Sequence, residues 1–235
     1  LRHPHGGRFE LPDLVVNNNG PGKKIYKNMK DAVGIHPSVA QKLSGADFDG
    51  DTVLVIPNNK RQIKSLRSLK ELKDFDPKRE YGVEHQTITK RHQQTQMGIV
   101  SNLITDMTIK DAPLSDIARA VRHSMVVIDA EKHKLDWKQS AIDNGIRALQ
   151  KKYQTKINPI TGKKSYGAST LISIADKDIK DKDGKHETYK DPYTNKKRSK
   201  VLMDTIDDAR KLSSGTVTEN LYADYINSLK KIRHN

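Results

Sequence analysis

Cysteine is absent from the sequence, and aromatic residues and long apolar runs are scarce. Without cysteine the chain can form neither a disulfide nor a thiolate-bound metal site, which fits a reducing cytoplasm. No run approaches the roughly 20 apolar residues of a membrane-spanning helix, so we expect neither a membrane span nor a signal peptide. Aromatic residues make up 5% of the 235 residues and hydrophobic residues 34%, so one large or two small domains can form around a lean core.

Positive charge, in contrast, is plentiful and unevenly distributed. The formal net charge is +14, but residues 1–59 hold 7 Lys or Arg against 6 Asp or Glu, which leaves 36 against 23 in the rest of the chain. A basic region beside an acidic segment suits a polyanion that is first held and then reacted on, and it predicts salt-sensitive binding to nucleic acid. A solvated, lysine-rich surface explains the same charge equally well.

Three aspartates at alternate positions, Asp47, Asp49 and Asp51, lie between Gly45 and Thr52. This spacing spreads side chains around a helix but places them on one face of an extended segment, and Gly50 permits a tight bend. Three ionised carboxylates held this close repel one another unless a cation neutralises them. Because a set of oxygen ligands suits a hard ion, the pattern predicts a site for Mg²⁺ or Mn²⁺.

Other interpretations of these aspartates are weaker. A solvated Asp-Gly turn does not account for three aspartates directly before the apolar run 53–56. A calcium loop of the EF-hand type, counted from Asp47, needs Gly at its sixth position and Glu at its twelfth, where the chain has Thr52 and Asn58. Residues 49–53 also resemble the nucleophile motif of haloacid-dehalogenase-type phosphatases, but that family has its apolar strand before the motif, whereas here the strand follows.

Residues 34–51, in which His36-Pro37 precedes Ala46-Asp47-Phe48-Asp49-Gly50-Asp51, resemble the catalytic segment of the large subunit of multisubunit RNA polymerases. Upstream, the order of Arg2, Pro4 and Arg8 is similar to the Asn-Arg-x-Pro-Thr-Leu-His-Arg element of that subunit. Residues 97–102 and 123–132 resemble the region after the metal loop in single-chain relatives. These relatives are the cellular RNA-dependent RNA polymerases and the polymerase-like proteins of phages and prophages, of which the phage type is preferred.

The resemblance implies a template-directed RNA polymerase, a nucleotidyltransferase in which Asp47, Asp49 and Asp51 hold the catalytic Mg²⁺ or Mn²⁺. It implies a DNA or RNA template, an RNA product and NTPs as partners, and the cytoplasm of a bacterial host as the location. Arg2 aligns with the arginine near the nucleotide sugar, and Arg8 is a candidate for contact with the nucleic-acid backbone. Gly45 departs from the multisubunit enzymes, which have Asn beside the ribose, so the usual basis for selecting NTPs over dNTPs is missing.

The expected fold is α+β, with a partial double-psi β-barrel followed by a mainly helical region. Residues 1–59 are assigned to the barrel, with extended pieces at 8–10, 13–16, 24–26 and 52–56 and a short helix from Pro37 to Leu43. Residues 60–153 are predicted to be helical and to pack beside the active site, with helices marked by apolar spacing over 97–107, 113–128 and 142–153. The apolar stripe of the second helix is expected to comprise Leu114, Ile117, Ala118, Val121, Met125 and Ile128, and the buried row of the third to comprise Ile142, Ile146, Leu149 and Tyr153. Residues 154–235 are expected to be basic, with loops at 154–166 and 176–200 and a final helix after a capping box at Thr216.

Two questions stay open: where the rest of the proposed enzyme lies, and whether the chain is active. The resemblance calls for a second barrel with catalytic lysines, which no stretch here has the β-rich composition to form, so we expect it elsewhere in the same chain or in a partner subunit. The chain is therefore interpreted as a fragment or as one subunit of a split enzyme. The alternative function is that of an inactive nucleic-acid-binding remnant of a polymerase.

Several polar residues downstream allow two interpretations each. Gln93, Gln94, Gln96 and Asn102 suit either nucleic-acid contacts or a solvated helix face. Gly98, within the same predicted helix, suits close packing of a neighbouring helix or close approach of a ligand. His123 and His133 have no partner at metal-binding spacing, so they are expected to be structural or surface residues.

Overall fold

The structure, a computed structural model, describes residues 11–17, 20–43, 52–64, 69–85, 87–157, 162–173, 178–191 and 195–234. The chain divides into two compact units, the first formed by residues 1–101 and 114–146 and the second by residues 102–113 and 147–235. Helix α3 (Lys90–Ile109) begins in the first unit and ends in the second. Each unit has a hydrophobic core cluster of its own.

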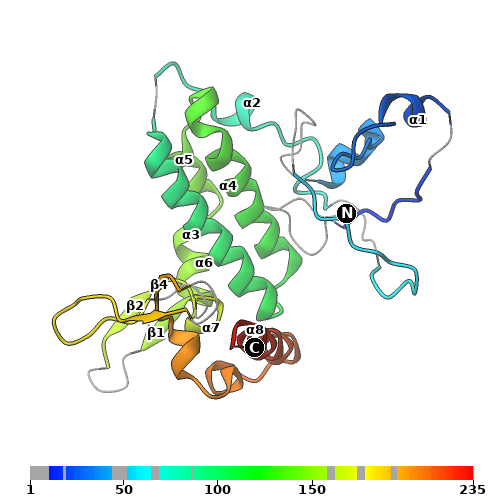
Figure 1. The fold of residues 1–235 in the computed structure, drawn as a ribbon. Helices are drawn as coiled ribbons and strands as arrows, with labels where there is room; N and C mark the ends of the chain where they lie inside the picture. The colour runs from blue at the N-terminus through cyan, green and yellow to red at the C-terminus, as the bar shows by residue number, and fades with distance from the viewer. Residues whose placement is uncertain are drawn as a thin grey trace. The chain divides into compact units, whose positions relative to one another are not determined.

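Two long helices, α3 and α4 (Leu114–His133), confirm the helical region predicted from apolar spacing (Figure 1). The buried side of α4 is broader than the predicted stripe, because Val126 and Val127 are fully buried while Met125 and Ile128 are only partly so. In the described part of the chain, no helix is both long and apolar enough to cross a bilayer.

The core of the first unit lies around α2 (Pro77–Tyr81) and α5 (Trp137–Asp143). Asp76 starts α2 by accepting a 2.9 Å hydrogen bond from the Lys78 amide, and Pro77 has the backbone angle that a first helical position requires. Trp137 lies at the edge of the core, where its indole N–H donates to the Thr87 carbonyl at 3.3 Å. The cluster comprises Tyr81, Ile88, Val126, Ala130 and Leu135, with Phe75 and Trp137 packed against it.

The helix predicted over 142–153 is interrupted, and α6 (Ile146–Tyr153) is separate from α5. Gly145 ends the first helix with a φ of 61°, a left-handed conformation that glycine adopts without strain. The Arg119 guanidinium donates from Nε to the Asn144 carbonyl at 3.0 Å, so this helix end is satisfied by a side chain. Ile142 is consequently 71% exposed, which makes its assignment to the buried row wrong, whereas Leu149 and Tyr153 are buried as predicted.

Two small antiparallel sheets lie in the second unit. Strand β1 (Thr155–Ile157) pairs with β2 (Lys164–Tyr166), and β3 (Thr188–Lys190) pairs with β4 (Lys197–Ser199). Together with the helices they make the chain α+β, the class expected. Both hairpins fall in segments predicted to be loops, because three-residue ladders of mainly polar residues lack the apolar alternation that signals a strand.

The core of the second unit is closed by α7 (Thr170–Ser173), two 3₁₀ helices, η2 (Leu202–Thr205) and η3 (Ala209–Leu212), and α8 (Val217–His234). Thr216 caps α8 as predicted, since its hydroxyl accepts a 3.1 Å hydrogen bond from the Glu219 amide. The Glu219 carboxylate turns instead to Ser214, whose amide lies at 2.7 Å. The core comprises Ile109, Leu171, Val201, Met203, Ala209, Ala223 and Ile226.

The part of the chain before the long helices contains less regular structure than predicted. The extended piece expected at 24–26 is wrong, because α1 (Pro21–Ile25) forms there behind Gly20, whose φ is 68°. Residues 13–16 have no strand, and of the predicted strand 52–56 only Leu54 makes a β-bridge. The short helix predicted from Pro37 is confirmed as a 3₁₀ helix, η1 (Pro37–Lys42).

Candidate functional site

The predicted site residues lie outside the described part of the chain. Asp47, Asp49 and Asp51 fall within 44–51, and Arg2 and Arg8 fall within 1–10. Among the residues that are described, no group of three or more His, Asp or Glu side chains is placed to hold a metal ion. The metal site therefore stays a prediction, and the structure bears on it only through the segments on either side.

The upstream flank is anchored by η1. The His36 ring lies 2.8 Å from the Ser38 hydroxyl through Nδ1, and the Ser38 amide lies 3.3 Å from the same nitrogen, so His36 acts as a cap for this short helix. Val39 is nearly buried and Leu43, the last described residue before the aspartates, is fully buried. The chain thus enters the aspartate segment from an apolar anchor.

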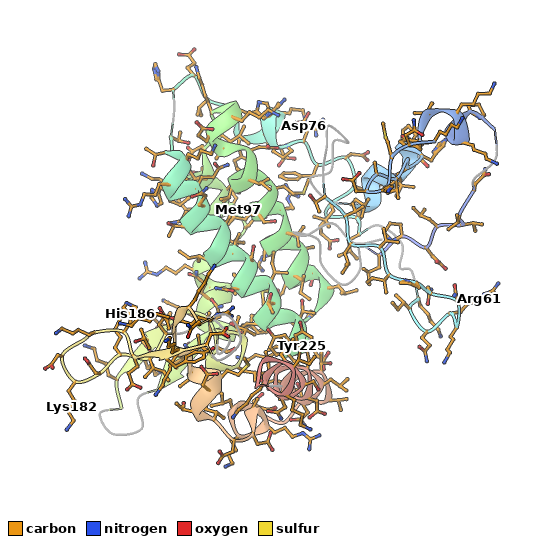
Figure 2. The ribbon with its side chains drawn as sticks, viewed as in Figure 1. Arg61, Asp76, Met97, Lys182, His186 and Tyr225 are labelled. Carbon is orange, nitrogen blue, oxygen red and sulfur yellow. The ribbon has the colours of Figure 1, made fainter. Side chains whose placement is uncertain are left out.

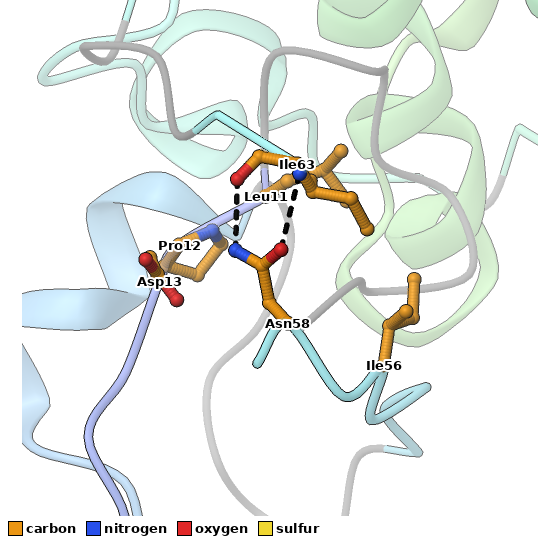
Figure 3. Close-up of a pocket in the computed structure, with 6 residues that line it drawn as sticks. All are labelled: Leu11, Pro12, Asp13, Ile56, Asn58 and Ile63. Carbon is orange, nitrogen blue, oxygen red and sulfur yellow. Dashed lines mark hydrogen bonds between the residues drawn. The ribbon is translucent and has the colours of Figure 1, made fainter. Parts of the chain in front are cut away.

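The downstream flank is closed by a side-chain clamp (Figure 3). The Asn58 amide group donates to the Ile63 carbonyl at 2.8 Å, and its oxygen accepts from the Ile63 amide at 3.0 Å. A single Asn side chain thereby makes both bonds of a strand-like pair across a five-residue interval. The Asn58-Asn59 dipeptide after Pro57 is a turn signal that sequence reasoning missed.

A small pocket lies beside this clamp (Figure 3). Leu11, Pro12 and Asp13 line it from one segment, and Ile56, Asn58 and Ile63 line it from the other. Leu11 comes three positions after Arg8, and Ile56 comes five positions after Asp51. The pocket therefore brings together the segments that follow the two predicted functional regions.

Two extended apolar stretches in this part of the chain face solvent. Val15 is 94% exposed and Val16 83%, and Leu54 and Val55 are each 55% exposed. Both stretches have the β-branched, apolar composition of strands, yet neither forms a ladder among the described residues. Apolar surface of this kind marks a place where another chain segment or a partner packs.

Of the four polar residues singled out on α3, Gln93 and Gln96 make structural contacts, and Gln94 and Asn102 are exposed. The Gln93 amide donates to the Val127 carbonyl at 3.1 Å and also to the Ile128 carbonyl, so Gln93 holds α3 against α4 and is not available for nucleic acid. Gln96 lies 3.0 Å from the His92 ring. A Cβ added at Gly98 would meet nothing within 4 Å, so no helix in the described part of the chain packs closely against this glycine.

His123 is structural, as predicted. It is 3% exposed, and its Nδ1 lies 3.1 Å from the Ser140 hydroxyl. Burial lowers the pKa of His123 from 6.5 to about 4, so the ring is neutral at physiological pH. The neutral imidazole contacts a buried serine and, among the described residues, no carboxylate, so its role is to support the packing of α4 on α5.

Two carboxylates with lowered pKa, Asp208 and Asp224, join η3 to the middle of α8. The Arg210 amide and the Asn227 side chain hydrogen-bond to Asp208 and lower its pKa. The Arg210 guanidinium binds Asp224 through two hydrogen bonds of 2.6 and 2.9 Å and lowers the pKa of that carboxyl. Because these groups are already paired with one another, they form a surface ion-pair network and not a ligand site.

Comparison with known proteins adds no family assignment. Neither the protein-family models, nor the curated proteins, nor the solved structures contain a significant match to this chain.

Proposed function

We propose that this chain carries the metal-binding segment of a template-directed RNA polymerase of the double-psi β-barrel type, closest to the single-chain phage kind. The observation that carries the proposal is the alternation of Asp47, Asp49 and Asp51 around Gly50. Three carboxylates on one face of an extended segment form an oxygen-only ligand set, which favours Mg²⁺ or Mn²⁺ over softer ions.

In this proposal each residue type has one task. The three aspartates hold the metal, Arg2 binds the nucleotide near its sugar, and Arg8 contacts the nucleic-acid backbone. Bound Mg²⁺ supplies activation of a primer 3′-hydroxyl and charge neutralisation at the triphosphate. The catalytic lysines come from a second barrel, in the same chain or in a partner subunit, and no protein nucleophile is required.

The flanks of the aspartate segment support this assignment. The fully buried Leu43 lies just before the aspartate segment, and the hydrogen-bonded pair Asn58 and Ile63 follows it. A ligand segment with fixed ends loses less conformational entropy when it binds its ion than one attached to free ends. The pocket formed by Leu11 and Ile56 further limits how far the chain after Arg8 can lie from the chain after Asp51.

The exposed apolar stretches are the second line of support. In a barrel, the runs 14–16 and 53–56 would pair with further strands and their apolar side chains would be covered. A partial barrel in this chain accounts for side chains such as Val15 that are 94% exposed here. A self-contained phosphatase domain gives no reason for leaving them uncovered.

Metal binding tests the proposal on this chain directly. Manganese titration followed by electron paramagnetic resonance is expected to reveal one specific site in the native protein, and Asp49→Asn is expected to weaken it strongly. Asp31→Asn, which removes an equal charge from an exposed aspartate in the same part of the chain, is the control and should bind as the native protein does. Equal binding by the native protein and Asp49→Asn would refute the metal site.

Primer extension then distinguishes an active polymerase from an inactive nucleic-acid-binding remnant. A protein that contains this chain and the second barrel is expected to extend a primer with Mg²⁺ and NTPs, and the Asp49→Asn form to be inactive. An inactive remnant would bind nucleic acid through its basic surface, as the net charge of +14 favours, without extending the primer under any metal condition.

A further inference from the structure

The strongest unassigned feature is the ribbon formed by β3 and β4, together with the segment 178–187 that leads into it. In the register of this pair Thr188 lies opposite Ser199, and Lys190 lies opposite Lys197. Residues directly opposite in an antiparallel pair share a face, and alternate residues of a strand share one too. Thr188, Lys190, Lys197 and Ser199 therefore form one face of the ribbon, which we call the lysine face.

The lysine face carries an unfavourable pairing. Lys190 and Lys197 are both exposed and directly opposite each other. Like charges in this position destabilise a hairpin. A ribbon that retains such a pair is most stable when an anion lies between or above the two ammonium groups.

Three carboxylates near the lysine face are engaged with other basic side chains. Asp178 lies 2.9 Å from the His186 ring, Glu187 lies 3.4 Å from the Lys200 ammonium, and Asp191 lies 2.8 Å from the Arg198 guanidinium. Within the described part of this segment, several lysine side chains have no carboxylate partner. They are Lys180, Lys182, Lys185, Lys190, Lys196 and Lys197.

The approach to the ribbon is ordered by its own hydrogen bonds. Asp181 Oδ1 accepts from the amides of Asp183 and Lys185, both at 2.9 Å, and Gly184 completes the turn with a φ of 78°. Lys182 projects from the outer end of this turn, and His186 lies at its base (Figure 2). The Glu187 amide then donates to the Ile179 carbonyl, and the Lys200 amide donates to the Glu187 carbonyl, at 2.9 and 2.8 Å. The lysines are thus presented by a fixed backbone.

We propose that the lysine face of the β3–β4 ribbon binds the phosphate backbone of double-stranded nucleic acid. The face offers two ammonium groups and two hydroxyls, which are donors suited to phosphate oxygens. It has no apolar side chain to enter a lipid bilayer and no aromatic side chain on which an unpaired base could stack. Because it lies in described residues and requires no metal, it stands apart from the aspartate site, although the proposed polymerase would use the same class of partner.

The test is a binding titration of the full chain in EDTA, with fluorescence anisotropy of a labelled DNA duplex at several salt concentrations. The double variant Lys190→Gln/Lys197→Gln is expected to bind about tenfold or more weakly and to lower the slope of log K against log salt by about 2, since two phosphate contacts are lost. The control Lys23→Gln/Lys24→Gln removes the same charge from α1 and should keep most of the affinity and slope. An equal loss in both double variants would overturn the proposal, because net charge alone would explain it.

A charge reversal distinguishes binding from folding. Lys190→Glu places a carboxylate opposite Lys197, so it is expected to stabilise the hairpin while it weakens duplex binding more than the glutamine variant does. Unchanged duplex binding in Lys190→Glu would refute the proposed role of the lysine face.

The same variants are also titrated with duplex RNA, a single strand and anionic vesicles. The proposal requires that the variants lose affinity for duplexes, and a loss of affinity confined to single strands or vesicles would overturn it. Since EDTA removes the metal, failure here leaves the manganese experiment on Asp49 unaffected.

Discussion

The carboxylate of Asp106, fully buried on α3, accepts a 2.7 Å hydrogen bond from the side-chain amide of Gln154, 48 positions later. The same oxygen accepts the Ser169 amide at 3.0 Å, so one aspartate joins the end of α3 to the residue after α6 and to the start of α7. The second oxygen of Asp106 is buried and has no hydrogen-bond partner among the residues that the structure describes.

We expect Asp106→Ala to destabilise the second unit by about 3 kcal/mol, since it leaves a buried amide and a buried N–H unpaired. Asp106→Asn should lose less, because its carbonyl oxygen can take the place of the accepting oxygen. Urea unfolding followed by circular dichroism measures both. Asp183→Ala, at an exposed position in the same unit, is the control, and a loss there equal to that of Asp106→Ala would contradict the structural role.

His123 should make stability depend on pH below neutrality. Its pKa is 6.5 when unfolded and about 4 when folded, so between these values the unfolded chain binds more protons. Stability is complete above pH 6.5 and falls as the pH drops towards 4, by about 3 kcal/mol in total.

The measurement compares unfolding free energies from pH 7 to pH 4 for the native protein and for His123→Gln. The variant is expected to have a flatter profile, whatever its stability at neutral pH. His85→Gln, at an exposed position, should keep the native slope. Parallel profiles for the native protein and His123→Gln would show that the buried ring is not the titrating group.

Gly98→Ala is expected to stabilise the chain by about 1 kcal/mol, because alanine favours the helix and the added methyl group meets no atom of the described residues within 4 Å. Thermal or urea unfolding measures the change. A loss of stability would mean that the exposed side of α3 is covered at this position. If stability rises but nucleic-acid binding weakens, the glycine serves a ligand, which was one of the two interpretations of this residue.

Gly145→Ala should act in the opposite direction and cost more than about 1 kcal/mol. Its φ is 61°, and an added Cβ would lie 2.7 Å from the Arg119 guanidinium that caps the carbonyl of Asn144. Gly184→Ala shares the positive φ, 78°, but has open space around it. Gly145→Ala is therefore expected to lose more stability than Gly184→Ala, and equal losses would show that the contact with Arg119 contributes nothing.

The sequence was most informative where one local signal determines the structure. Apolar spacing predicted α3 and α4, and the Thr216 cap predicted the start of α8. Both signals act within a few residues, so neither depends on distant contacts. His123 was likewise assigned a structural role from the absence of nearby ligands, and its burial agrees.

Features that depend on distant partners or on single backbone angles were missed. The break at Gly145 depends on Arg119, which lies on another helix, and the β3–β4 ladder depends on pairing across a polar loop. The extended piece predicted at 24–26 became a helix because Gly20 and Pro21 favour a turn start more strongly than Ile25 and Tyr26 favour a strand. The aspartate segment, Arg2 and Arg8 lie outside the described residues, so that part of the prediction awaits the metal titration.

Trp137 is the one tryptophan of the chain and packs against the edge of the first unit's core, with its ring centroid 5.2 Å from that of His92. Its emission therefore reports on that unit alone, whereas far-ultraviolet circular dichroism sums the helices of both. If the two signals change at different denaturant concentrations, the units melt independently, and the helix they share must unwind in two stages.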